Sequence, residues 1–232
     1  MVLKRVEGQL AYDFASKAQI FGIDVGVDSP AKLLATMQHF RVPTRLLDWT
    51  YSAYVGLYFA FEAVHECNDA ALWAVNVSAL HVEATLRALP PVKFAGRKMG
   101  SPIRFLDFGK EDNFRKHVLP DLDDYHRTLL SGEPALNIVV PLSPRTQNER
   151  ISAQQGVFLC PSRLNSALLS QMDEMMAGVK DDWITKLVVP RTLREEVLRR
   201  LLEMNIHPLT LFPGLDGLGS FCVQKAELHG WG

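Results

Sequence analysis

The order of apolar and polar positions along the chain predicts helices and strands without a regular βαβ repeat. Apolar residues recur every three or four positions over 2–21, which predicts a helix with Val6, Leu10, Phe14, Ala18 and Phe21 facing inward. Further helices are predicted over 31–40, 53–65, 111–118, 165–177 and 193–204. Strands are predicted over 45–50, 71–77, 136–142, 156–160 and 184–189. We therefore expect an α+β fold, a mixed sheet with helices packed around it.

Two local signals refine this picture. Pro43 ends the helix over 31–40, because proline disfavours α geometry at the residue before it. The helix over 53–65 is almost wholly apolar, which predicts burial on all sides. The chain has no repeat and no evident linker, so we expect residues 1–232 to form a single domain.

Composition excludes several classes of protein. The formal net charge of −1 provides no global field for nucleic acid or an anionic membrane. The three cysteines lack CxxC spacing, which argues against a disulfide framework and against a cysteine zinc site. No run of 18 apolar residues and no apolar leader is present, so we expect a cytoplasmic protein that does not span a membrane. Phosphate-loop, dinucleotide-binding and hydrolase-elbow motifs are also absent from the sequence.

The densest polar segment, 38–50, lies between two apolar helices. In one interpretation it is a structural network in which Arg45 pairs with a buried, hydrogen-bonded Asp48 while Trp49 packs. In the other, Arg45 binds a phosphate or carboxylate through its planar fork of donors, and Trp49 and Phe40 offer aromatic faces. His39 has no second ligand at metal-binding spacing, so no metal site is predicted here.

A second polar segment, 148–158, immediately precedes and enters a predicted strand. Arg150 and Gln154 would share one face of a helical turn, and Gly156 would permit close backbone approach or an unusual φ. This segment is either an ordinary surface helix or the edge of a site. In the second case, we expect Arg45 or Asp48 to share a cleft with Arg150 or Gln154.

Together these segments resemble the FRG domain family of bacterial proteins, which is named after an N-terminal aromatic-Arg-Gly motif. The family run Gln-His-x-Gly-x-Pro-Thr-Arg-Leu-Leu-Asp-Trp-Thr is matched by 38–50, and its A-L-Y-F-A helix by 56–60. A later R-x-x-x-Q-x-G-x-F pattern matches Arg150, Gln154, Gly156 and Phe158, and the run 212–218 is also similar to family members. The chain departs from the family at Arg41, where glycine is usual, and it lacks the aromatic-Arg-Gly motif, so we expect an N-terminally shortened domain.

The resemblance implies a layout similar to ADP-ribosyltransferase folds and a polar pocket for a nucleotide-like ligand, with NAD as the implied cofactor. Arg45 would hold the pyrophosphate or orient Asp48, Trp49 would stack, and Gln154 would address the ribose, which makes Arg45, Asp48 and Gln154 the candidate catalytic residues. The implied setting is a bacterial toxin or phage defence. The implied ligand-binding residues are Gln38, His39, Thr44, Trp49, Thr50, Glu149, Arg150, Gln155 and Gly156.

The alternative is a non-catalytic module that binds a nucleotide, a nucleic acid or a protein. It is favoured by the amides at Gln154 and Gln155, where a transferase carries a catalytic glutamate, whereas Glu149 comes five residues too early. A glutamine stabilises an oxocarbenium-like ribose poorly. We therefore expect residues 1–232 to show no NAD hydrolysis or ADP-ribosyl transfer.

Overall fold

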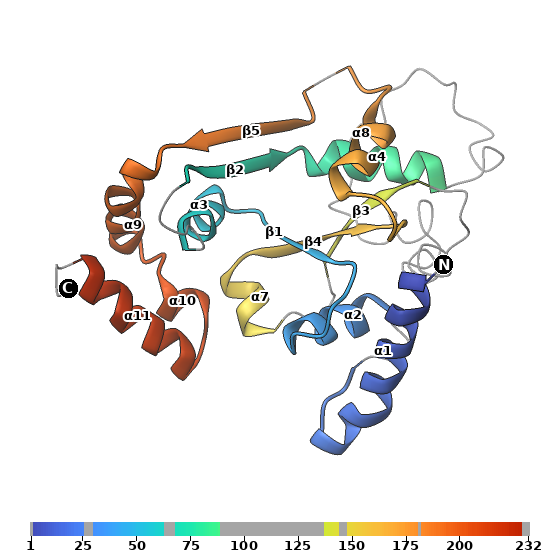
Figure 1. The fold of residues 1–232 in the computed structure, drawn as a ribbon, viewed down its shortest axis with the longest axis horizontal. Helices are drawn as coiled ribbons and strands as arrows, with labels where there is room; N and C mark the ends of the chain where they lie inside the picture. The colour runs from blue at the N-terminus through green and yellow to red at the C-terminus, as the bar shows by residue number, and fades with distance from the viewer. Residues whose placement is uncertain are drawn as a thin grey trace, which may run out of the picture. The chain divides into compact units, whose positions relative to one another are not determined.

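A computed structural model describes residues 2–25, 30–62, 68–88, 137–143, 148–180 and 182–228 (Figure 1). The helix predicted over 111–118 lies outside the described residues. The chain divides into two compact units. Unit 1 comprises Met1–Leu46, Leu80–Val140 and Cys160–Gly178, and unit 2 comprises Leu47–Ala79, Pro141–Leu159 and Val179–Gly232. Both units combine helices with strand segments, which confirms the α+β class.

Unit 1 is built mainly from helices. They are α1 (Val2–Ala18), the 3-10 helix η1 (Gln19–Phe21), α2 (Pro30–His39), most of α4 (Val77–Ala88) and α8 (Leu168–Met176). Met37, Leu80, Ile138, Met172 and Met175 are its largest fully buried side chains, together with Met176 and Val139. Strand β3 (Val139–Leu142) begins in this unit.

The prediction of which face of the first helix points inward is partly wrong. Ala18 is buried, but Val6 is 48% exposed and Phe21 is 78% exposed. The helix instead turns Glu7 toward the interior of the unit, where it meets a buried arginine. A periodic pattern of apolar residues could not reveal this because the inward position is a charge.

Arg41 follows α2 in the left-handed region, with φ 62°. Its N–H donates to the Gln38 carbonyl at 2.9 Å, and the Val42 N–H donates to the Met37 carbonyl at 2.9 Å. These two bonds form a Schellman C-cap, in which glycine is the residue normally found at the left-handed position. The family's glycine therefore has a backbone reason, and Arg41 occupies a strained position.

Unit 2 contains two small sheets and the C-terminal helices. In the first sheet the strand order is β1 (Leu47–Thr50), β4 (Gly156–Pro161), β3, and β1 runs antiparallel to β4 with Thr50 opposite Gly156. In the second, β2 (Ala70–Val75) lies antiparallel to β5 (Ile184–Val189), as Figure 1 shows. Within the described residues, two small sheets thus replace the single mixed sheet that we expected. The helices are α3 (Ala53–Glu62), α7 (Glu149–Ala153), η3 (Arg191–Leu193), α9 (Arg194–Glu203), α10 (Pro208–Leu211) and α11 (Leu215–Leu228).

The core of unit 2 forms around α3. Val55, Tyr58 and Phe61 on one face of that helix pack with Ala70 of β2 and with Leu198, Leu201 and Leu211. The opposite side is open, since Tyr54 is 56% exposed, so the prediction that this helix is buried on all sides is wrong. Ser52 caps α3 by accepting the Val55 N–H at 3.3 Å.

Helix α4 was not predicted. The strand predicted to reach residue 77 stops at Val75, because the Asn76 side chain accepts the Ala79 N–H at 3.0 Å and starts a helix. Among the described residues, no helix is long and apolar enough to cross a membrane.

The geometry of Arg41 predicts that Arg41→Gly stabilises the protein. A left-handed conformation costs a non-glycine residue about 1–2 kcal/mol, which exceeds the extra unfolded-state entropy of glycine, so we expect a net gain of about 0.5–1 kcal/mol. The measurement is urea unfolding. Arg41→Ala is the control, because it removes the exposed side chain but keeps the strain, and it should not raise stability. A gain from alanine equal to that from glycine would contradict the backbone explanation.

Candidate functional site

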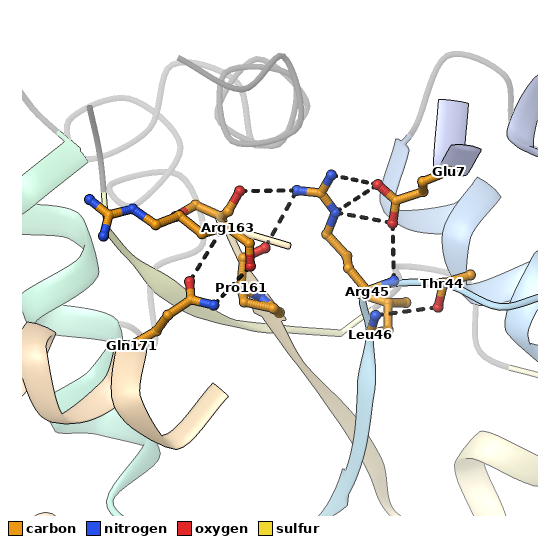
Figure 2. Close-up of polar contacts among 8 residues, drawn as sticks. Glu7, Thr44, Arg45, Leu46, Pro161, Arg163 and Gln171 are labelled. Carbon is orange, nitrogen blue, oxygen red and sulfur yellow. Dashed lines mark hydrogen bonds and ion pairs between the residues drawn. The ribbon is translucent and has the colours of Figure 1, made fainter. Parts of the chain in front are cut away.

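Arg45 is the centre of a buried polar network in unit 1 (Figure 2). Its Nε donates to Glu7 Oε2 at 2.9 Å, its Nη2 also bonds Glu7, and its own backbone N–H donates to Glu7 Oε1 at 3.0 Å. Nη1 donates to the carbonyls of Pro161 and Ser162, each at 3.4 Å. The side chains of Arg45 and Glu7 are only 2% and 12% exposed. The guanidinium therefore joins α1 to the end of β4.

A second buried side chain holds the loop that follows these carbonyls. Gln171 on α8 is 1% exposed and donates to the carbonyls of Arg163 and Ser166, at 2.8 and 3.1 Å. Its Oε1 accepts the Arg163 N–H at 3.2 Å, so one side chain fixes the loop that follows β4. The nearby Cys160 thiol is fully buried, and burial raises its pKa to about 12, which makes it unreactive.

This network corrects the predicted partner of Arg45. Asp48 is exposed rather than buried, whereas Arg45 takes its carboxylate from Glu7. Glu7 was not predicted as the partner because it lies 38 residues before Arg45, on α1. The sequence did hold a hint of this partner, since a buried arginine requires a carboxylate and Glu7 lies in the helix predicted before the segment 38–50.

The remaining residues of the first polar segment have local roles. Thr44 donates its hydroxyl proton to the Gln38 side chain and accepts the Leu46 N–H at 3.3 Å. His39 is exposed and lies edge-on to Phe40, with ring centroids 4.9 Å apart. Trp49 is half-buried, and its indole N–H has no hydrogen-bond partner among the described residues.

In unit 2 the end of β1 meets the turn between α7 and β4. The Thr50 hydroxyl donates to the Gln154 carbonyl at 2.7 Å, and the Tyr51 N–H donates to the Gln155 carbonyl at 3.0 Å. The unusual φ expected at Gly156 falls instead on Gln155, at 49°. At Gly156 a Cβ would lie 3.3 Å from Ile151 Cγ2 and 3.4 Å from the Ile151 carbonyl oxygen, which is only slightly tighter than ordinary contact. The two polar segments thus meet here, and a cleft common to Arg45 and Gln154 stays a prediction.

Two side chains of α7 and its cap reach the C-terminal region of unit 2. Gln154 Nε2 donates to the Leu211 carbonyl at 3.0 Å. The Arg150 guanidinium lies over the Phe212 ring, 4.9 Å from its centroid. Glu149 is exposed in the first turn of α7, whose N-cap Asn148 accepts the Ile151 N–H. Arg150 and Gln154, which lie four positions apart, therefore contact two neighbouring residues, Phe212 and Leu211.

Within the run 212–218, Gly217 packs directly against the backbone of Phe212. A Cβ on Gly217 would lie 1.9 Å from the Phe212 carbonyl oxygen and 2.9 Å from the Pro208 carbonyl oxygen. Helix α11 can therefore pack against this turn only without a side chain at that position. The Phe212 ring also meets Phe59 of α3 nearly perpendicularly, with centroids 5.9 Å apart.

An acid and a phenol lie on the same side of α3. The Tyr58 hydroxyl donates to Glu62 Oε1 at 3.4 Å. Burial raises the pKa of Glu62, while the Tyr58 hydrogen bond and the charge of Arg150 oppose that rise. Burial and the Glu62 charge both raise the pKa of Tyr58, so its hydroxyl stays protonated.

Comparison with known proteins identifies part of the chain. Residues 4–69 match the family model described as the FRG domain. The match confirms the resemblance inferred from the block over 38–50, and it includes both Glu7 and Arg45. No curated protein and no solved structure matched the chain.

Two glycines of α11, Gly217 and Gly219, have different surroundings, so we predict opposite effects when each is replaced by alanine. Gly217→Ala forces α11 off the Phe212 carbonyl and should cost about 3 kcal/mol. Gly219→Ala meets nothing within 4 Å, so it should stabilise the helix by about 0.5–1 kcal/mol. Thermal unfolding of both variants decides this, and equal effects would contradict the packing described here.

Proposed function

We propose that this chain, which carries an FRG domain over residues 4–69, binds a nucleotide-like anion through Arg150 in unit 2 without performing NAD chemistry. The observation that supports it is the state of the Arg150 guanidinium. The residue is exposed and stacked on Phe212, and its N–H groups donate no hydrogen bond to any other residue in the described part of the chain. A planar cation held in this way has its donors available for a phosphate.

The surroundings of Arg150 favour a nucleotide over a simple anion. The Phe212 ring lies against the guanidinium and contacts the Phe59 ring, and both rings are partly exposed, so aromatic surface for a base adjoins the cation. Gln155 adds an exposed amide at the neighbouring turn. A few polar groups beside an aromatic surface are typical of small-molecule sites.

The same residues argue against catalysis by this chain. The late position that would carry a transferase glutamate holds Gln154, whose amide donates to the Leu211 carbonyl. Arg45, the arginine of the family block, is bonded to Glu7 and to two carbonyls. NAD-dependent transfer, in a toxin or phage-defence setting, is the wider hypothesis of the family resemblance, and NAD is included as a test ligand for that reason.

Thermal unfolding of the full chain with NAD, ADP-ribose and ATP tests the proposal. A ligand present at 100 times its Kd should stabilise the native state by about 2.7 kcal/mol. We expect at least one of the three to raise the unfolding temperature, and Arg150→Ala to abolish that rise. Arg199→Ala is the matched control, because Arg199 is an exposed arginine of the same unit that pairs with Glu195.

Two results would overturn the proposal. One is no stabilisation by any of the three ligands, and the other is equal stabilisation of the native chain and Arg150→Ala. Release of nicotinamide from NAD above a protein-free control would refute the non-catalytic part alone.

A further inference from the structure

Glu62 belongs to the same surface as Arg150. It lies one helical turn after Phe59 on α3, and residues three apart share a helix face. Phe59 contacts the Phe212 ring, and that ring carries the Arg150 guanidinium. We name this set, Tyr58, Phe59, Glu62, Arg150 and Phe212, the α3–α7 patch.

Within the α3–α7 patch a cation and a carboxyl group influence each other electrostatically without forming an ion pair. Arg150 is close enough to lower the pKa of Glu62, yet the two form no direct ion pair among the described residues. The bond from Tyr58 at 3.4 Å restrains the orientation of the Glu62 carboxyl group. The other carboxyl oxygen accepts no hydrogen bond from the described residues.

We infer that Glu62 accepts hydrogen bonds from the ribose hydroxyls of a ligand whose phosphate is bound by Arg150, so that the α3–α7 patch selects ribonucleotides. The inference rests on the proposed function and names its ligand class. A carboxylate is acceptor-only when ionised, and its two oxygens can receive a vicinal diol. Acidic side chains hold the ribose in this way in dinucleotide-binding folds. Tyr58 acts as a positioning residue for Glu62.

A sugar without the 2′ and 3′ hydroxyls leaves one Glu62 oxygen without a donor, while the other keeps the hydrogen bond from Tyr58. Hydrogen bonds to charged groups are each worth enough to change affinity about tenfold or more. The expected signature is therefore a preference for ADP over 2′,3′-dideoxy-ADP of about tenfold or more. Both compounds carry the same base and diphosphate, so the comparison isolates the sugar.

Calorimetric titration of the full chain with these two nucleotides tests the inference. We expect Glu62→Gln to remove the preference for ADP without weakening the binding of dideoxy-ADP, and Arg150→Ala to weaken both nucleotides. Glu227→Gln, an acidic residue of the same unit that pairs with Arg194, is the control and should keep the preference. Two results would overturn the role of Glu62 and leave the binding by Arg150 intact. One is equal affinity of the native chain for the two nucleotides, and the other is a preference for ADP that survives in Glu62→Gln. If the native chain binds neither nucleotide, the role of Glu62 is overturned, and the unfolding experiment with NAD, ADP-ribose and ATP decides separately whether the proposed function fails as well.

Discussion

A buried arginine must have its charge and its donors satisfied inside the protein, and unit 1 is organised around this constraint. The Arg45 guanidinium has an acid on one side, Glu7, and two backbone carbonyls on the other. The acid comes from α1 and the carbonyls come from the end of β4, so one side chain ties a helix to the end of a strand. Removing one member of such a pair leaves the other buried without compensation, which is typically more costly than losing a surface ion pair.

In unit 2, polar side chains likewise form hydrogen bonds with backbone groups. Gln154 satisfies the Leu211 carbonyl, and Thr50 satisfies that of Gln154. Gly217 contributes by having no side chain, which lets α11 approach Phe212. Arg45, Thr50, Gln154 and Gly217 thus each have a role in the fold. Arg150 differs, because Phe212 orients it while its donors stay available, and this contrast motivates a binding role.

Local periodicity predicted most of the described elements. Strand β5 was predicted at its observed bounds, and α9 differs by one residue at each end, because both have clear patterns and turn signals. Helix α4 was missed, since its start depends on one Asn76 hydrogen bond. The resemblance to the FRG family was available from the sequence and is confirmed over 4–69.

The sequence singled out Arg45 and Gln154 as important polar residues, but it did not predict the groups to which they bond. Sequence proximity suggested Asp48 for Arg45, whereas the fold supplies Glu7 from a separate helix. Likewise nothing local links Gln154 to Leu211, which lies 57 positions later. A single sequence records which residues are polar, while long-range packing decides which groups they meet.

A double-mutant cycle between Glu7 and Arg45 tests the central claim most directly. Glu7→Gln, Arg45→Met and the double variant are compared by urea unfolding, with ADP affinity measured on each. The account predicts that the two single substitutions are strongly non-additive, with a coupling energy of about 2 kcal/mol or more, and that folded Arg45→Met still binds ADP. Additive effects within about 0.5 kcal/mol, together with loss of ADP binding in Arg45→Met alone, would show that Arg45 serves a ligand and not the fold.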